Sequence, residues 1–197
     1  MFISNEHRFI FVSTPKNATH SVYDALERYN LGCRVGNYHN RDIPQSCLDY
    51  SIFTVVRNPY SRAVSTWWHL TRRRKYKNTW LPKIGGEGFG RFMTYITTNE
   101  PSGRGDVVAI PQFQWLADIP LTHFVHLENL GSELRALPFL PDDISVDHKF
   151  TAAEEEPGVV RFKAPEWRDR MTPANVELIR QWAGSDFELY GYDPNEI

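Results

Sequence analysis

Short apolar runs punctuate the first two thirds of the chain. Residues 9–12 (Phe-Ile-Phe-Val) and 51–56 (Ser-Ile-Phe-Thr-Val-Val) are rich in β-branched and aromatic side chains, a composition that predicts buried strands. Residues 123–127 (His-Phe-Val-His-Leu) predict a third strand. The first two runs each end at a polar break, so that a loop with chemistry-bearing side chains follows each strand.

Helical spacing of apolar side chains follows each of the first two strands, over residues 19–29 and 59–74. A later helix is expected after Thr172, which suits an N-cap, with Pro173 in its first turn. Alternating strands and helices predict an α/β fold of three layers, with a central, mostly parallel sheet flanked by helices. Ligands of such sheets bind at the carboxyl ends of the strands.

The chain has 197 residues, the length of one domain. We expect a single domain over residues 1–197 with a mobile insertion around 77–112. The front of that insertion, 85–90, holds four glycines in six residues. It is interpreted either as a lid or acceptor-binding loop, or as a surface insertion.

Charge is distributed unevenly along the chain. Residues 1–100 hold 14 Lys and Arg against 7 Asp and Glu, whereas residues 101–197 hold 8 against 17. A basic first half predicts an anionic ligand there, or two oppositely charged halves that face each other in the fold. The overall net charge of −2 argues against a nucleic-acid partner.

The two cysteines, Cys33 and Cys47, have no CxxC spacing and no histidines at metal-finger distances. We therefore expect no metal site and a reduced, cytoplasmic protein. The first residues contain a polar interruption from Ser4 to Arg8 and no long apolar run. Neither a signal peptide nor a membrane anchor is expected.

The first polar break, residues 14–21, reads Thr-Pro-Lys-Asn-Ala-Thr-His-Ser. A lysine between a strand and a helix, followed by small and hydroxyl residues, is typical of a cradle for phosphate or sulfate. Backbone N–H groups and the hydroxyls of Thr19 and Ser21 can donate to the oxygens, and Lys16 adds positive charge. The glycines of a Walker A loop are absent. A plain strand–turn–helix corner is the alternative interpretation.

The second polar break begins at Arg57, which ends the second predicted strand. Ser65 follows eight residues later, about one and a half turns into the next helix. An arginine at a strand end, joined by a hydroxyl from the adjoining helix, is suited to hold a second phosphate. Two anion sites at two strand ends predict a ligand with two separated anionic groups.

In these motifs the sequence resembles the sulfotransferases that use 3′-phosphoadenosine 5′-phosphosulfate (PAPS). IFVSTPKNATHS (10–21) is similar to their 5′-phosphosulfate loop, and FTVVRNPYSRAVS (53–65) to their 3′-phosphate motif. Weaker similarity continues through 111–130 and 186–192. The resemblance implies the P-loop NTPase-like sulfotransferase fold, carbohydrate-type branch. It also implies transfer of a sulfuryl group to a hydroxyl or amine, with adenosine 3′,5′-bisphosphate as product.

The resemblance also assigns roles to residues. Lys16 would contact the phosphosulfate and stabilise the leaving oxygen. Further donor contacts are implied for Asn17, Ala18, Thr19, His20, Ser21, Arg57 and Ser65, the last two at the 3′-phosphate. Many relatives have glycine where Ala18 stands and a hydroxyl residue where His20 stands. Alanine serves at its position if no positive φ is required there.

In-line sulfuryl transfer depends on positioning and electrostatics, so that no metal is expected. The acceptor, a small molecule or a glycan, must lose a proton to a general base. Similar enzymes place a catalytic histidine where His39 stands, in the polar loop before the second strand; a surface histidine is the alternative interpretation. His148 and Glu128 are the next candidates, although Glu128 also suits a cap of the helix that it opens, and Asp106 stays possible. His69 is interpreted as a packing or acceptor-side residue.

Residues 72–77 (Arg-Arg-Arg-Lys-Tyr-Lys) are the densest positive stretch. They are interpreted as a solvated helix end or as a contact surface for an acidic acceptor such as a sulfated glycan. Trp67 and Trp68 fit the apolar side of a helix, so core packing is expected before sugar stacking.

Two rival functions remain open. A P-loop-type kinase requires a Walker A lysine and an acidic magnesium ligand at a strand end; the first is absent, and residues 125–128 match the second poorly. A noncatalytic nucleotide- or anion-binding module requires no base near the donor's sulfur. The sequence leaves the oligomeric state open.

Overall fold

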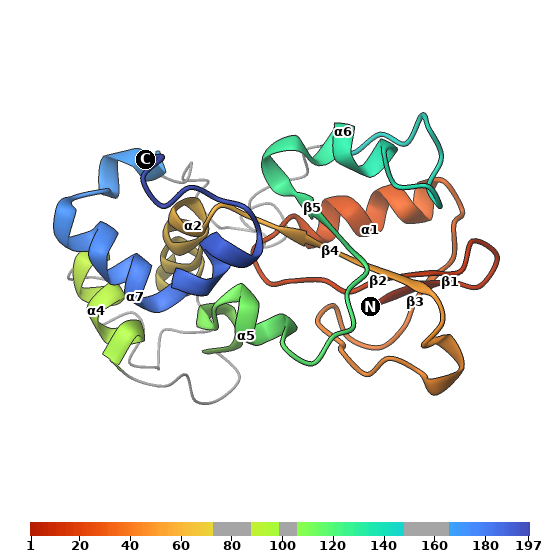
Figure 1. The fold of residues 1–197 in the computed structure, drawn as a ribbon, viewed down its shortest axis with the longest axis horizontal. Coiled ribbons are helices and arrows are strands. Elements are labelled where there is room, and N and C mark those ends of the chain that lie inside the picture. The colour runs from red at the N-terminus through yellow and green to blue at the C-terminus, as the bar shows by residue number, and fades with distance from the viewer. Residues whose placement is uncertain (73–87, 99–105, 148–165) are drawn as a thin grey trace. The chain divides into compact units, whose positions relative to one another are not determined.

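The computed structural model describes residues 1–72, 88–98, 106–147 and 166–197. The chain divides into two compact units (Figure 1). The first consists of Met1–Arg57 and Leu116–Lys149, and the second of Asn58–Trp115 and Phe150–Ile197. Within the described residues, the first unit contains the sheet and the second is helical.

A five-stranded sheet of order β3-β1-β2-β4-β5 forms the first unit. Its strands are β1 (Phe2–Ser4), β2 (Phe9–Phe11), β3 (Cys33–Arg34), β4 (Ser51–Val56) and β5 (His123–His126). The three predicted strands, β2, β4 and β5, are parallel neighbours. However, β1 runs antiparallel to both β2 and β3. The sheet is therefore mixed, which corrects the expectation of a mostly parallel sheet.

The antiparallel edge explains why that expectation was wrong. The polar stretch from Ser4 to Arg8 is the turn of a hairpin that joins β1 to β2. Ser4 Oγ accepts the backbone N–H of His7 at 3.2 Å, and Arg8 adopts a positive φ of 52°. Strand β3 has only two residues, too few for a period-2 pattern to be visible in the sequence.

Two helices, α1 (Thr19–Arg28) and α6 (Leu130–Arg135), lie side by side over one face of the sheet (Figure 1). Apolar side chains of both helices and of the sheet form one core, and the helices shield this core from water. Short 3-10 turns, η1 (Gln45–Cys47) and η4 (Leu127–Asn129), precede β4 and α6. Principal core residues are Phe9, Phe11, Val22, Tyr23, Leu26, Phe53, Val55, Val125, Leu130 and Leu134.

The second unit has its own core among its helices and turns. These are α2 (Pro59–Arg72), α4 (Phe89–Thr98), η3 (Asp106–Ala109), α5 (Gln112–Leu116), η5 (Trp167–Arg170) and α7 (Pro173–Leu189). Buried Asp186 of α7 accepts the backbone N–H groups of Gln112 at 3.0 Å and Phe113 at 2.6 Å. This carboxylate therefore satisfies the N-terminus of α5. Among the described helices, none combines the length and apolar composition needed to cross a membrane.

Helices α2 and α4 test the expectations for the tryptophans and for the insertion. Trp67 is buried in the second core and Trp68 packs against it, which confirms core packing. Residues 89–98, which belong to the expected insertion, form the amphipathic helix α4, because its apolar side chains recur at helical spacing and are buried. Residues 73–87 and 99–105 lie outside the described residues. These include most of the basic run 72–77 and the first half of the glycine-rich segment 85–90.

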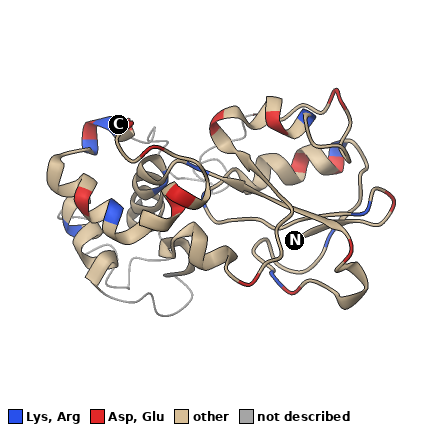
Figure 2. Ribbon diagram, in the orientation of Figure 1, with Lys and Arg blue, Asp and Glu red and all other residues tan. Residues whose placement is uncertain are grey.

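Some ion pairs of the first unit join the two halves of the sequence, whereas others, such as Arg34 with Glu27, stay within the basic half. Arg28 pairs with Asp147 at 2.7 Å, and Arg41 with Asp118 at 3.5 Å. Each pair joins a cation from the basic first half of the sequence to a carboxylate from the acidic second half. Both signs of charge occur on each unit (Figure 2), so that the basic half does not form a uniformly basic unit.

Candidate functional site

The loop that follows β2 has a backbone conformation suited to bind an anion. Lys16 and Ala18 have positive φ values of 71° and 54°, with Asn17 between them. Such alternation of backbone handedness directs successive N–H groups toward one side and forms a concave anion site. Helix α1 begins directly afterwards at Thr19 and has no acidic residue in its first turn. Its N-terminal dipole therefore favours negative charge at the same place.

Buried polar side chains hold this loop against the sheet. Asn17 Nδ2 donates to the carbonyl of Val55 at 2.8 Å, and its backbone N–H donates to Thr14 at 3.3 Å. Thr19 Oγ1 donates to the same Thr14 carbonyl at 3.2 Å. Asn17 and Thr19 thus shape the loop with their side chains, and we expect any contact of Thr19 with an anion to come from its backbone.

Ala18 adopts the conformation that the sequence analysis reserved for glycine. It is the N-cap of α1 with φ 54° and ψ 29°, in the left-handed region, and no side chain caps the helix there. Alanine was expected to serve here only if no positive φ is required, and the structure requires one. A left-handed alanine costs about 1 kcal/mol because its Cβ crowds the following carbonyl.

We therefore expect Ala18→Gly to stabilise the protein by about 1 kcal/mol, since glycine adopts this conformation without strain. Ala25→Gly in the same helix is the matched control. It should destabilise by about 1 kcal/mol or more, because Ala25 is helical and buried. Urea denaturation measures both free energies of unfolding. A loss of stability in both variants would contradict the strain assigned to Ala18.

Arg57 lies next to the same loop. It follows β4 directly, as the sequence predicts, and its Nη1 donates to the backbone carbonyl of Lys16 at 3.2 Å. The ladder between β2 and β4 continues to Val12, whose N–H donates to Phe53 at 3.0 Å. The loop after β2 and the arginine that follows β4 therefore meet at the carboxyl ends of these strands, where Lys16 and Arg57 supply two positive charges.

His39 lies beside the beginning of the loop. Its Nδ1 is 3.2 Å from Oγ of the buried Ser13. Burial lowers the pKa of His39 to about 4; the positive charges of His20 and Lys16 act in the same direction, and a hydrogen bond with the Ser13 backbone opposes them. The imidazole is therefore neutral near pH 7 and able to accept a proton. Its half-buried ring, which responds to the charge of Lys16, argues against a mere surface histidine.

The lowered pKa of His39 predicts a loss of stability in acid. Because the unfolded histidine titrates near 6.5, the unfolded state binds more protons than the folded state between pH 6.5 and about 4. The free energy of unfolding should fall on acidification through this window, with a slope approaching about 1.4 kcal/mol per pH unit. His39→Gln should remove this component. Urea denaturation of both proteins from pH 7.5 to 4 measures it, and equal slopes would contradict the assignment.

The remaining site predictions fall in different places. His20 is exposed, with its ring centroid 4.6 Å from that of Tyr38, whereas Ser21 is buried in the first turn of α1. Ser65 lies on α2, in the second unit. Lys16 through Ser21, His39 and Arg57 all belong to the first unit. The structure thus brings the predicted loop, His39 and Arg57 together, and Ser65 stays a prediction.

Of the alternative bases, Glu128 is the one that the structure describes in the first unit. Glu128 is exposed on η4 of the first unit, and His69 is half-buried on α2 of the second. Asp106 begins η3 of the second unit, and His148 lies outside the described residues. Within the described ranges, no group of three or more His, Cys, Asp or Glu is placed to hold a metal ion. The metal-free reaction stays a prediction.

The polar contacts beneath the loop were not predicted from the sequence. Thr14 Oγ1 lies 2.9 Å from Thr54 Oγ1, and Thr54 Oγ1 also donates to the carbonyl of Val12 at 2.7 Å. A signal existed for Thr54, because it interrupts the otherwise apolar interior of β4. Ser13 carried no comparable signal, since its contact with His39 joins residues 26 positions apart.

Comparison with known proteins agrees with this geometry. A family model described as the sulfotransferase family matches residues 1–193, nearly the whole chain. The chain therefore belongs to the sulfotransferase family. It is an enzyme of sulfuryl transfer, and the family implies a sulfate donor. Neither a search of curated proteins nor a search of solved structures found a match.

Proposed function

We propose that this sulfotransferase moves a sulfuryl group from PAPS to a hydroxyl or amine of a carbohydrate or small-molecule acceptor, by in-line displacement. The observation that carries the proposal is the hydrogen bond from Arg57 to the Lys16 carbonyl. This hydrogen bond places Arg57 beside the loop that carries Lys16. A ligand with two anionic groups needs two such cationic side chains close to each other. PAPS has such groups in its 5′-phosphosulfate and its 3′-phosphate.

The loop provides the proposed site for the 5′-phosphosulfate. Lys16 supplies charge, Asn17 and Thr19 maintain the loop, and the backbone from Ala18 to Ser21 faces the anion at the start of α1. Contacts with the nucleotide are also proposed for His20 and Ser21. Arg57 is proposed to bind the 3′-phosphate through its planar guanidinium, together with Ser65.

The proposed reaction uses these charges in one displacement. The acceptor oxygen or nitrogen bonds to sulfur as the bond from sulfur to the bridging oxygen breaks. The electron pair of the broken bond leaves on adenosine 3′,5′-bisphosphate, where the Lys16 ammonium stabilises the developing charge. The acceptor's proton passes to neutral His39, which acts as general base. Lys16 and His39 are therefore the proposed catalytic residues.

The setting of the reaction is proposed from the sequence. A reduced, cytoplasmic enzyme fits two cysteines that form no disulfide, Cys33 exposed and Cys47 buried. A small-molecule or glycan acceptor is proposed, and neither nucleic acid nor membrane is expected as a partner.

The proposal is tested by incubating the protein with PAPS and a panel of acceptors: sulfated and unsulfated glycans, phenols, alcohols and amines. Release of adenosine 3′,5′-bisphosphate and sulfation of the acceptor are followed by chromatography. We expect both products in equal amounts with at least one acceptor class. Transfer of phosphate from ATP to the same acceptors, without use of PAPS, would overturn the proposal.

A further inference from the structure

The peptide group between Lys16 and Asn17 is held at both of its ends. Its carbonyl, that of Lys16, accepts a hydrogen bond from Nη1 of Arg57 at 3.2 Å. Its N–H, that of Asn17, donates to the carbonyl of Thr14 at 3.3 Å. Because a peptide group is planar, these two hydrogen bonds fix the orientation of the backbone from which the Lys16 side chain extends.

The backbone conformation of Lys16 needs such support. Its φ of 71° lies in the left-handed region, where a residue with a Cβ is strained. Strained residues persist where the surrounding structure holds them in place, and they gather at functional sites. The hydrogen bond from Arg57 is one of these supporting contacts, and it acts on the carbonyl of the strained residue itself.

Strand β4 provides the fixed end of this contact. Its last residue, Val56, pairs with β5, and Arg57 follows it directly. One residue earlier, the carbonyl of Val55 accepts Nδ2 of Asn17 at 2.8 Å. The segment of Lys16 and Asn17 is therefore attached to the end of β4 at two points, once through a side chain of the loop and once through the side chain of Arg57.

We propose that Arg57 is also a positioning residue for Lys16. Its hydrogen bond to the Lys16 carbonyl sets the direction in which the lysine side chain leaves the loop, and thereby places the ammonium at the leaving oxygen. This inference rests on the proposed function, in which Arg57 binds the 3′-phosphate and Lys16 stabilises the leaving group. A guanidinium has five N–H donors in a planar fork, so that one side chain can serve both a carbonyl and a phosphate.

A double-mutant cycle tests this role. Arg57→Ala should lower kcat at saturating PAPS by about tenfold to a hundredfold, because a misplaced reacting group costs rate. In the Lys16→Met background the same substitution should change kcat by less than about twofold, since no ammonium is left to misplace. A loss of kcat by the same factor in both backgrounds, or an effect of Arg57→Ala on KM alone, would overturn the inference.

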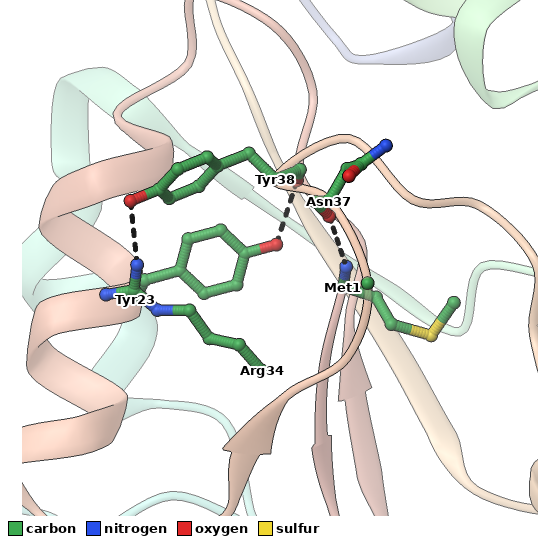
Figure 3. A pocket seen from close by; sticks show the side chains of 6 residues that line it. Met1, Tyr23, Arg34, Asn37 and Tyr38 are labelled. Atoms are coloured by element: carbon green, nitrogen blue, oxygen red, sulfur yellow. Dashed lines mark hydrogen bonds between the residues drawn. The ribbon is translucent and has the colours of Figure 1, made fainter.

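Arg34→Ala is the matched control. Arg34 is another half-buried arginine of the same unit, and its Nη1 donates to Tyr38 Oη at 2.9 Å. Figure 3 shows this contact beside a pocket of about 150 Å³. Arg34 thus holds the residue before His39, and its replacement should change kcat by the same factor with and without the Lys16→Met substitution. An effect of Arg34→Ala that vanished in the Lys16→Met background would show that the coupling is not specific to Arg57, and would also contradict the inference.

The hydrogen bond itself is measured without any reaction. Protein labelled with ¹³C-carbonyl lysine and ¹⁵N-asparagine gives one carbonyl–amide NMR signal for each Lys-Asn pair, and the sequence has two, at 16–17 and 77–78. Lys77→Arg removes the second signal. Because a hydrogen bond deshields the carbonyl carbon, we expect the Lys16 signal to move to lower chemical shift in Arg57→Ala and to stay in place in Arg34→Ala. An unmoved signal in Arg57→Ala would refute the proposed role.

These results separate the inference from the proposed function. If the wild type transfers sulfuryl groups and Arg57→Ala acts equally in both backgrounds, the positioning role is wrong and the proposed function stands. If the wild type uses no PAPS with any acceptor, the proposed function fails, and the NMR signal still decides whether Arg57 holds the Lys16 backbone. Thermal unfolding verifies that each variant folds.

Discussion

His39→Gln should lower kcat for sulfuryl transfer by about 10²–10⁴-fold, the usual contribution of a general base. Glutamine approximates the size of the ring but cannot take a proton at neutral pH. Burial lowers the pKa of His39 to about 4 and keeps the ring neutral, so the wild-type base is available throughout the physiological range. Steady-state kinetics with PAPS and a responsive acceptor, at pH 6 to 8, measures the effect.

The control for this experiment is His7→Gln. His7 is an exposed histidine of the same unit, in the turn before β2 and thus at the opposite end of that strand from the loop. Its replacement should leave kcat unchanged. If His39→Gln retains more than about a tenth of wild-type kcat, the proton passes elsewhere, because a loss below tenfold is too small for a general base.

Lys16→Met should reduce kcat by about 10²–10³-fold, as the removal of one group that stabilises developing charge does in other enzymes. Methionine retains much of the aliphatic chain and loses the ammonium that would neutralise the leaving oxygen. Because that charge develops during the reaction, kcat should fall more than affinity for adenosine 3′,5′-bisphosphate. Kinetics and calorimetric titration of the bisphosphate measure the two quantities separately.

Arg28→Met provides the matched control for Lys16. Arg28 ends α1, nine residues from the first residue of that helix and paired with Asp147. Its distance from the loop is about 13 Å along the helix axis. Its replacement removes an equal charge and should leave both kcat and bisphosphate affinity as they are. Equal effects of the two substitutions would mean that Lys16 acts only through the overall charge.

Much of the site was predictable because its residues are contiguous. Strand β2, the polar break and helix α1 follow one another within 20 residues, so that local patterns define the loop. Arg57 was predictable for the same reason, since it directly follows the apolar run of β4. Parallel pairing of β2 with β4 then places both breaks at one edge of the sheet.

Other features depend on contacts between distant residues, which no local pattern reveals. The φ of Ala18 is set by the junction of loop and helix, although its sequence favours a right-handed backbone. The hydroxyl of Ser13 meets the carbonyl of Tyr38, 25 residues away. The antiparallel pairing of β1 with β2 was not predicted for a similar reason. The polar residues between the two strands do not show, in the sequence alone, that the chain reverses its direction there.

In the proposed function, the loop and Arg57 bind a nucleotide with separate 5′ and 3′ anions. Thermal unfolding with adenosine 3′,5′-bisphosphate, AMP, ADP or ATP with magnesium tests it most directly, on the wild type and Arg57→Ala. At about 100 times its Kd a ligand stabilises by about 2.7 kcal/mol. We expect this shift with the bisphosphate alone, and its loss in Arg57→Ala. Equal stabilisation by ATP with magnesium, unchanged in Arg57→Ala, would contradict the account and indicate a kinase or a general nucleotide-binding module.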